Sequence, residues 1–160
     1  TVLLDAGTTC CAVARAIPPR MRLRVIPHSL AGVDALRDKP GVDVVCTGGQ
    51  YDRDLGSFVG PAAERALGQY HADVSFLGAA HANVEQGLVN NHLSETNVKR
   101  MIHDHADQCY LLVDSSKLGV RGLVTTLAIE EFRGTIITDS NVSQSVAASF
   151  REHGVSLITV

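Results

Sequence analysis

The stretch Thr1-Val-Leu-Leu-Asp-Ala-Gly-Thr-Thr9, which is followed by a helical pattern, decides the fold. A short apolar run stops at Asp5, the chain turns at Gly7, and two hydroxyl side chains stand where a helix should begin. The start of a helix offers unpaired backbone N–H groups and the positive end of a dipole, so it suits an anion. Gly7 permits close approach to a ligand, and Thr8 and Thr9 add hydroxyl donors. The same residues are also typical of a plain helix cap.

The composition indicates one globular domain. The chain has 160 residues, of which 45% are hydrophobic and 19% charged, enough for a single sizeable core. Its net charge of −3 and the lack of a lysine-rich run argue against a nucleic-acid-binding surface on this segment. Because no apolar stretch approaches membrane-spanning length and no secretory signal pattern is present, we expect a cytoplasmic protein with no membrane partner. The abrupt start inside a strand predicts that the chain is part of a longer protein.

Short apolar runs alternate with segments of helical periodicity. Because the runs lack polar alternation, both faces of the sheet should be buried, as in a parallel sheet. The predicted strands are Val2–Leu4, Leu23–Ile26, Val42–Cys46, Val74–Leu77, Cys109–Val113, Thr135–Thr138 and Ser156–Val160. The predicted helices are Thr9–Ile17, Leu30–Arg37, Pro61–Tyr70, Glu95–His105 and Val142–His153. The sequence therefore predicts an α/β fold with a doubly wound, mostly parallel sheet and helices on both faces.

The residues that follow the strands favour a particular ligand class. Ligands of open α/β sheets bind beyond the carboxyl ends of the strands. Aromatic residues make up only 4% of the chain and Trp is absent, which disfavours a flat aromatic ligand and favours a phosphorylated sugar. Each strand ends in small or polar residues, namely Asp5, His28-Ser29, Thr47-Gly48-Gly49, Gly78, Asp114-Ser-Ser-Lys117 and Asp139.

Three charged side chains are candidate ligand contacts. Lys117 lies just beyond a strand and can meet a phosphate or carboxylate, or it can be a solvated loop lysine. Glu95 and Lys99 lie four residues apart on a helix, a spacing also typical of a surface ion pair. Because Lys99 adjoins the apolar stripe of Val98 and Ile102, the pair should lie beside the packed face. Glu95 is then expected to accept ligand hydroxyls, with Lys99 orienting it or meeting an anion.

Several other site classes lack their defining residues. There is no G-x-G-x-x-G after the first strand, no P-loop and no G-x-S-x-G elbow, and the seven histidines have no metal-ligand spacing. The sequence therefore predicts neither a metal nor a cofactor. Cys10, Cys11, Cys46 and Cys109 are predicted to be buried free thiols of a reducing compartment. A reactive thiol at Cys10 or Cys11 is the alternative, because a helix start lowers a thiol pKa.

Eight elements, in order along the chain, resemble the C-terminal effector-sensing domain of DeoR-type bacterial transcriptional regulators. They are Asp5-Ala-Gly-Thr-Thr9, Gly48-Gly49, Ser57-Phe-Val-Gly-Pro61, Asp73-Val-Ser-Phe-Leu-Gly-Ala79, Gly87-Leu88, Glu95 with Val98-Lys99-Arg100, Asp114-Ser-Ser-Lys-Leu-Gly119 and Ile137-Thr-Asp139. The resemblance implies a fold related to ribose-5-phosphate isomerase and glucosamine-6-phosphate deaminase. It also implies a phosphorylated sugar or related metabolite that is sensed rather than transformed. Members of the family carry an N-terminal helix-turn-helix domain that binds operator DNA, which is absent from this chain, and they form dimers or tetramers.

The resemblance also assigns residues. Gly7, Thr8 and Thr9 match a phosphate-facing loop, Lys117 matches the lysine of the isomerases' Asp-x-Ser-Lys motif, and Glu95 falls where they place a catalytic glutamate. However, the isomerases' Asp-Gly-Ala-Asp segment is Leu77-Gly-Ala-Ala80 here, so no catalytic residue is predicted. The predicted ligand-binding residues are Asp5, Gly7, Thr8, Thr9, Ser29, Gly48, Gly49, Gly78, Ala79, His81, Glu95, Lys99, Asp114 and Lys117.

Two departures from the family pattern concern ligand choice. His28 lies in Pro27-His-Ser29, where the family has Thr-Asn-Ser, and His81 replaces a glycine. Both side chains either border the sugar end of the pocket or only fill loops. Two rival functions remain open: a phosphosugar isomerase or deaminase that uses Glu95 as a base, and an oligomerisation module with a vestigial cleft.

Overall fold

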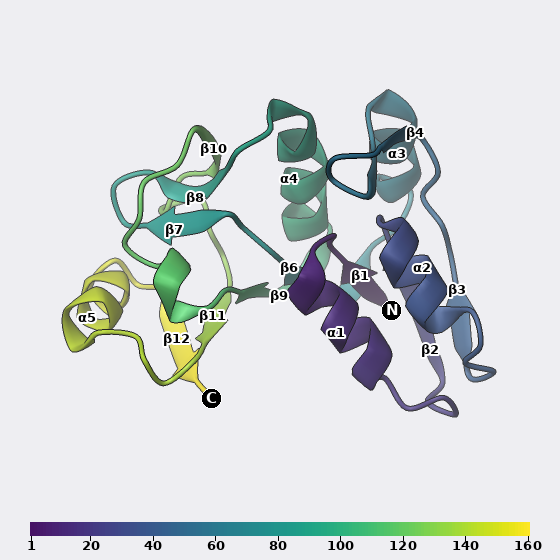
Figure 1. The fold of residues 1–160 in the computed structure, drawn as a ribbon, viewed down its shortest axis with the longest axis horizontal. Coiled ribbons are helices and arrows are strands. Elements are labelled where there is room, and N and C mark those ends of the chain that lie inside the picture. The colour runs from purple at the N-terminus through teal and green to yellow at the C-terminus, as the bar shows by residue number, and fades with distance from the viewer.

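The computed structural model describes residues 1–160, which fold around a parallel sheet of seven strands (Figure 1). Every neighbouring pair of strands in this sheet is parallel. The predicted α/β fold and all seven predicted strands are therefore confirmed. In sheet order the strands are β12 (Ser156–Thr159), β11 (Thr135–Thr138), β9 (Ala106–Leu112), β6 (Ala72–Leu77), β1 (Val2–Leu4), β2 (Leu23–Pro27) and β3 (Val42–Val44).

Helices cover both faces of the sheet, as predicted. Successive residues of a strand point to opposite faces, so neighbouring residues of one strand join different cores. Leu3 and Leu111 belong to a large core with α3, α4 and α5, whereas the next residues, Leu4 and Leu112, belong to a smaller core with α1 and α2. Figure 1 shows α1 and α2 together in front of the sheet and α5 beside β12. The helices are α1 (Thr8–Ala16), α2 (Leu30–Leu36), α3 (Pro61–Leu67), α4 (Thr96–Asp104) and α5 (Gln144–Glu152).

The order of the strands places a crevice beside β1. From β1 the chain first builds the sheet in one direction, through β2 to β3, and then returns to add β6, β9, β11 and β12 on the other side. The strand order therefore reverses between β1 and β6. In open α/β sheets this switch point, at the carboxyl ends of the strands, is where ligands bind.

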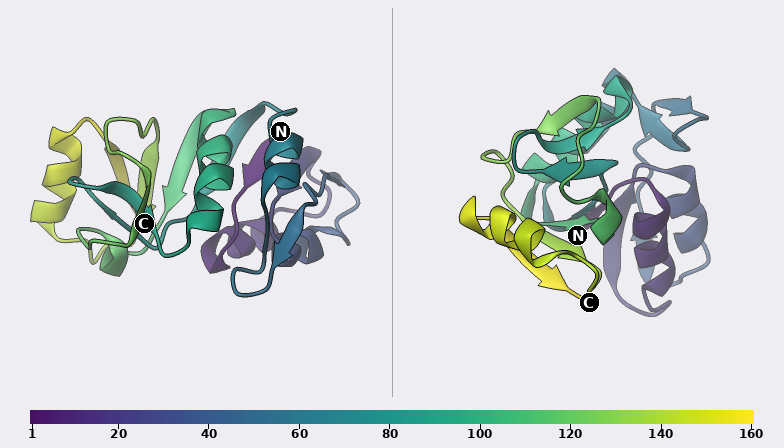
Figure 2. Two further views of the ribbon diagram at one scale, coloured as in Figure 1. Left: turned by 90° about the horizontal axis from the view of Figure 1, so that it is seen from above. Right: turned by 60° about the vertical axis from the view of Figure 1, so that its left-hand side comes forward.

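Two small antiparallel sheets, which the sequence did not predict, lie beside the central sheet (Figure 2). A hairpin pairs β4 (Gln50–Asp52) with β5 (Ser57–Val59), and β8 (Gly87–Asn90) lies between β7 (His81–Asn83) and β10 (Val124–Leu127). Their strands are three or four residues long and rich in polar side chains, so they lack the apolar runs that mark the central strands.

Element ends differ from the predictions by a few residues. The third strand ends at Val44 rather than at Cys46 because the chain leaves the sheet there, and Cys46 is exposed. The prediction that Cys46 is buried is therefore wrong, whereas the other three cysteines are buried. Before α4 a 3-10 turn, η1 (Leu93–Glu95), includes Glu95. None of the helices has the length and apolar character required to cross a bilayer.

Candidate functional site

The loop between β1 and α1 opens onto a cavity at the switch point. Gly7 precedes the helix with a φ of 99° and a ψ of 165°, and no side chain caps the first turn. The amides of this turn therefore have no side-chain acceptor. The cavity has a volume of about 120 Å³ and is lined by Ala6, Gly7, Thr8, Thr9, Cys10, Leu55, Gly78, Ala79, Glu95, Lys99, Leu112 and Lys117.

Asp5 lies behind this cavity and links three elements. It is 1% exposed, and its Oδ2 accepts hydrogen bonds from the Gly78 amide, at 2.7 Å, and from Lys99 Nζ, at 2.5 Å. These contacts connect the end of β1 to the end of β6 and to α4. Asp5 was predicted to contact the ligand, but it does not line the cavity. Its carboxylate instead holds Gly78 and Lys99 in position.

Lys99 is the buried cation of the site. Besides its bond to Asp5, its Nζ donates to the Gly78 carbonyl at 3.0 Å. Burial acts to lower the pKa of Lys99, but the carboxylates of Asp5 and Glu95 outweigh burial and raise it, so the ammonium stays charged. An ammonium has three donors and two are occupied here, which leaves one for a ligand in the cavity that Lys99 lines.

Glu95 reaches the same cavity from η1. Its side chain is partly buried, and burial raises its pKa, with Lys99 opposing the shift and Asp5 adding to it. The ion pair that Lys99 forms is with Asp5 and not with Glu95, so the surface ion pair suggested by their spacing is not formed. Glu95 is left as an acceptor on the cavity wall.

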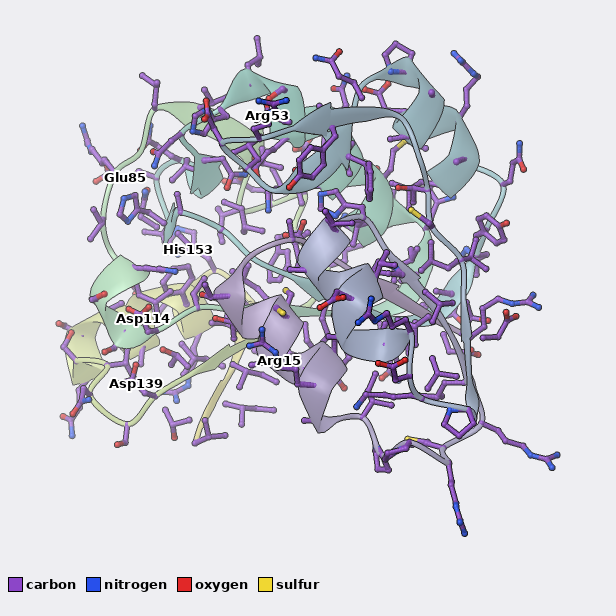
Figure 3. All side chains as sticks on the ribbon, turned by 45° about the vertical axis from the view of Figure 1, so that its right-hand side comes forward. Arg15, Arg53, Glu85, Asp114, Asp139 and His153 are labelled. Carbon is purple, nitrogen blue, oxygen red and sulfur yellow. The ribbon has the colours of Figure 1, made fainter.

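Lys117 reaches the cavity from η2 (Ser115–Lys117), the 3-10 turn after β9. Its Nζ lies 3.7 Å from a carboxylate oxygen of Asp114, which itself accepts from the Ser116 amide and does not line the cavity. The turn is anchored by Asp139, which accepts from the Ser115 amide at 2.7 Å and from its hydroxyl at 2.9 Å. Figure 3 shows Asp114 and Asp139 at this turn. Hydrogen bonds to the Ser115 and Asn141 amides lower the pKa of Asp139 to about 2.

Four other predicted contacts lie outside this cavity. Ser29 caps α2 by accepting from the Gly32 amide at 3.1 Å. Gly48 and Gly49 lie in the loop after β3. A Cβ on Gly49 would come within 2.9 Å of the Ala63 side chain, so the backbone at Gly49 packs closely against α3 and not against the cavity. His81 lies on β7, and its Nδ1 is buried without a partner.

His28 lies beneath the site and not on its wall. Its side chain is 0% exposed, and its Nδ1 lies 3.4 Å from Oδ1 of Asp5. Burial lowers the pKa of His28 to about 4 even though Asp5 opposes the shift, so the imidazole is neutral near pH 7. His28 therefore lies against Asp5 and does not line the cavity.

A second hollow adjoins the cavity and contains residues that the sequence did not predict. It has a volume of about 290 Å³ and shares Gly7, Thr8 and Leu55 with the cavity. Leu55 belongs to the β4–β5 hairpin, and no sequence pattern distinguishes it from other loop residues. The remaining lining residues are Cys11, Arg15, Ser29, Ala31 and Gly56.

The Cys10 thiol near the site is not activated. Burial, with a further contribution from Asp5, raises the pKa of the Cys10 thiol, and Lys99 only partly opposes this. The raised pKa disfavours a reactive thiol at Cys10, and the same alternative for Cys11 stays a prediction. No three His, Cys, Asp or Glu side chains are grouped so that they could hold a metal ion.

The fold and the cavity define an α/β domain with a candidate ligand site at the switch point. Residues 1–140 match the family described as the DeoR C terminal sensor domain, and the chain belongs to this family. The predicted resemblance is thus confirmed.

Curated relatives of the chain are named as regulators of transcription. It is 28% identical to the HTH-type transcriptional regulator GolR of Listeria innocua over 97% of this chain and 61% of that protein. It is 35% identical to the transcriptional repressor AccR of Agrobacterium fabrum, over 88% of this chain and 54% of that protein. It is 29% identical to the HTH-type transcriptional repressor GlcR of Bacillus subtilis, over 98% and 60%. The chain thus spans little more than half the length of these relatives.

Proposed function

We propose that this domain binds a phosphorylated sugar, or a related phosphorylated metabolite, in the cavity beside β1. The observation that carries the proposal is the uncapped first turn of α1, whose amides open onto a cavity that also holds two lysines and a glutamate. Backbone amides and ammonium groups suit a phosphate, whereas a carboxylate and a lysine donor suit hydroxyl groups. One small cavity thus offers both kinds of contact.

We assign the two kinds of contact to the two ends of the ligand. The phosphate would accept from the amides of Thr8 and Thr9 and meet the ammonium of Lys117. The sugar hydroxyls would donate to Glu95 and accept from the third donor of Lys99. Gly78 and Ala79 form a wall without large side chains, which lets the ligand approach the backbone.

The regulatory role rests on the family and its named regulators. We propose that the complete protein carries a DNA-binding helix-turn-helix domain in addition to this chain, binds operator DNA as a homo-oligomer in the cytoplasm, and represses transcription. A ligand changes DNA binding only if it binds one arrangement of the protein more tightly than the other. The phosphosugar would supply this difference in affinity.

Thermal unfolding tests the ligand class. A phosphosugar at a hundredfold excess over its Kd should raise the Tm by roughly 5–10 °C, because it binds only the folded state. The parent sugars without phosphate should have little effect. Lys117→Gln should reduce the shift, and Arg151→Gln, which removes an exposed charge on α5, should leave it unchanged. If no phosphosugar in a broad panel shifts the Tm at millimolar concentration, the proposal is wrong.

A phosphosugar isomerase or deaminase is the second candidate, and the raised pKa of Glu95 favours it. A half-buried carboxyl that holds its proton more tightly is typical of a general acid or base. Against it, the segment Leu77-Gly-Ala-Ala80 brings no acidic partner to the cavity, and Lys99 is engaged with Asp5. Incubation with aldose and ketose phosphates tests this candidate. Interconversion that Glu95→Gln abolishes would establish an enzyme in place of a sensor.

A further inference from the structure

The cavity at the start of α1 is small for the ligand that we propose. Its volume of about 120 Å³ is below the roughly 300 Å³ at the lower end of ordinary small-molecule sites. The adjoining hollow adds about 290 Å³ and shares Gly7, Thr8 and Leu55 with it. A ligand with its phosphate at Thr8 would therefore have room to extend into the hollow.

One stripe of α1 forms the wall of the hollow. Thr8, Cys11 and Arg15 are spaced by three and four residues, so they share a face of the helix. The rise from Thr8 to Arg15 is about 10 Å. Side chains of a helix lean toward its N-terminus, so the flexible Arg15 side chain is directed back along this stripe toward the cavity. Figure 3 shows Arg15 projecting from α1.

The guanidinium of Arg15 is free to bind a ligand. Arg15 is exposed, forms no ion pair, and is the only charged residue that lines the hollow. Its backbone carbonyl accepts from Lys39 Nζ at 2.7 Å, which fixes the end of α1 but does not engage the side chain. The remaining lining residues are small or apolar, apart from the hydroxyls of Thr8 and Ser29. The hollow thus carries an uncompensated positive charge.

We propose that this hollow is a second anion subsite and that Arg15 binds a second anionic group of the same ligand. The inference rests on the proposed function and narrows it to sugars with an anionic group at each end, either a sugar bisphosphate or a phosphorylated sugar acid. An arginine fork matches the geometry of both phosphate and carboxylate. The distance along α1 is within the span of a six-carbon sugar that carries such groups at its two ends.

Isothermal titration with two matched pairs of compounds tests the subsite. Fructose 1,6-bisphosphate is compared with fructose 6-phosphate, and 6-phosphogluconate with glucose 6-phosphate, all at one ionic strength. In at least one pair the compound with two anionic ends should bind about tenfold more tightly to the native chain. The pair that shows the gain distinguishes a second phosphate from a carboxylate.

Two arginine variants separate the subsite from general charge attraction. Arg15→Gln should reduce the gain to within about twofold while the Kd of the monophosphate stays nearly unchanged. Arg20→Gln removes the same charge from the loop after α1, outside both hollows, and should preserve the gain. A gain that survives Arg15→Gln, or monophosphate binding with no gain in either pair, would overturn the subsite alone. Failure of all four compounds to bind would contradict the proposed function as well.

Discussion

The carboxylate of Asp5 and the ammonium of Lys99 lie 2.5 Å apart, with side chains that are 0% and 5% exposed. The two residues are 94 positions apart in the sequence, so the contact exists only in the folded chain. Removal of two charges from water is costly, and their attraction offsets that cost only while both are present. The stability of the domain therefore depends on an ion pair whose lysine lines the cavity.

Loss of one partner of this pair should destabilise the domain more than loss of both. Lys99→Met or Asp5→Leu alone leaves a buried charge without a partner, which should lower the free energy of unfolding by about 3–5 kcal/mol. The double variant removes both charges and should recover much of this loss. Urea denaturation of the four proteins gives the coupling energy directly. Single-variant effects that simply add in the double variant would contradict a coupled pair.

His28 should make the domain sensitive to mild acid. Its pKa is about 4 in the folded state and 6.5 in the unfolded chain, so between these values the unfolded state binds more protons. The contribution of His28 to the free energy of unfolding is therefore fully present above pH 6.5. It is lost as the pH decreases toward 4, by about 3 kcal/mol in all.

Urea midpoints measured between pH 7 and pH 4.5 check this expectation. In His28→Gln the slope of stability against pH should become shallower, because the buried titrating group is gone. His153→Gln changes an exposed histidine on the far side of the domain and should keep the native slope. An unchanged slope in His28→Gln would show that another group is responsible.

Gly7 and Gly60 form a natural pair for separating folding from ligand binding. Each precedes a helix with a φ near +90° and an extended ψ, and a Cβ on either would meet no atom within 4 Å. Alanine is strained in this conformation, so both Gly7→Ala and Gly60→Ala should cost about 1–3 kcal/mol of stability. Only Gly7 lines the cavity. Titration calorimetry should show weaker phosphosugar binding for Gly7→Ala alone, and equal binding by both variants would contradict the role of this turn.

The sequence predicted the central sheet well because continuous apolar runs mark strands that are buried on both faces. It also predicted that Gly7, Gly78 and Lys117 lie together, since all three follow strands whose carboxyl ends meet at one edge, and all three line one cavity. It did not predict the partner of Lys99, because local spacing favoured Glu95 and only the tertiary structure brings Asp5 near. Arg15 and Leu55 were missed because nothing in an exposed helix position or a hairpin loop reveals that it borders a cavity.

The amides of the first turn of α1 provide the most direct measurement of the central claim. In amide-resolved NMR spectra, titration with a phosphosugar that binds should shift the resonances of Thr8, Thr9 and Cys10 downfield as these amides donate to the phosphate. The parent sugar without phosphate should leave them in place. If the phosphosugar binds while these three resonances stay unshifted and amides elsewhere move, the phosphate lies at another site and the account of this cavity is wrong.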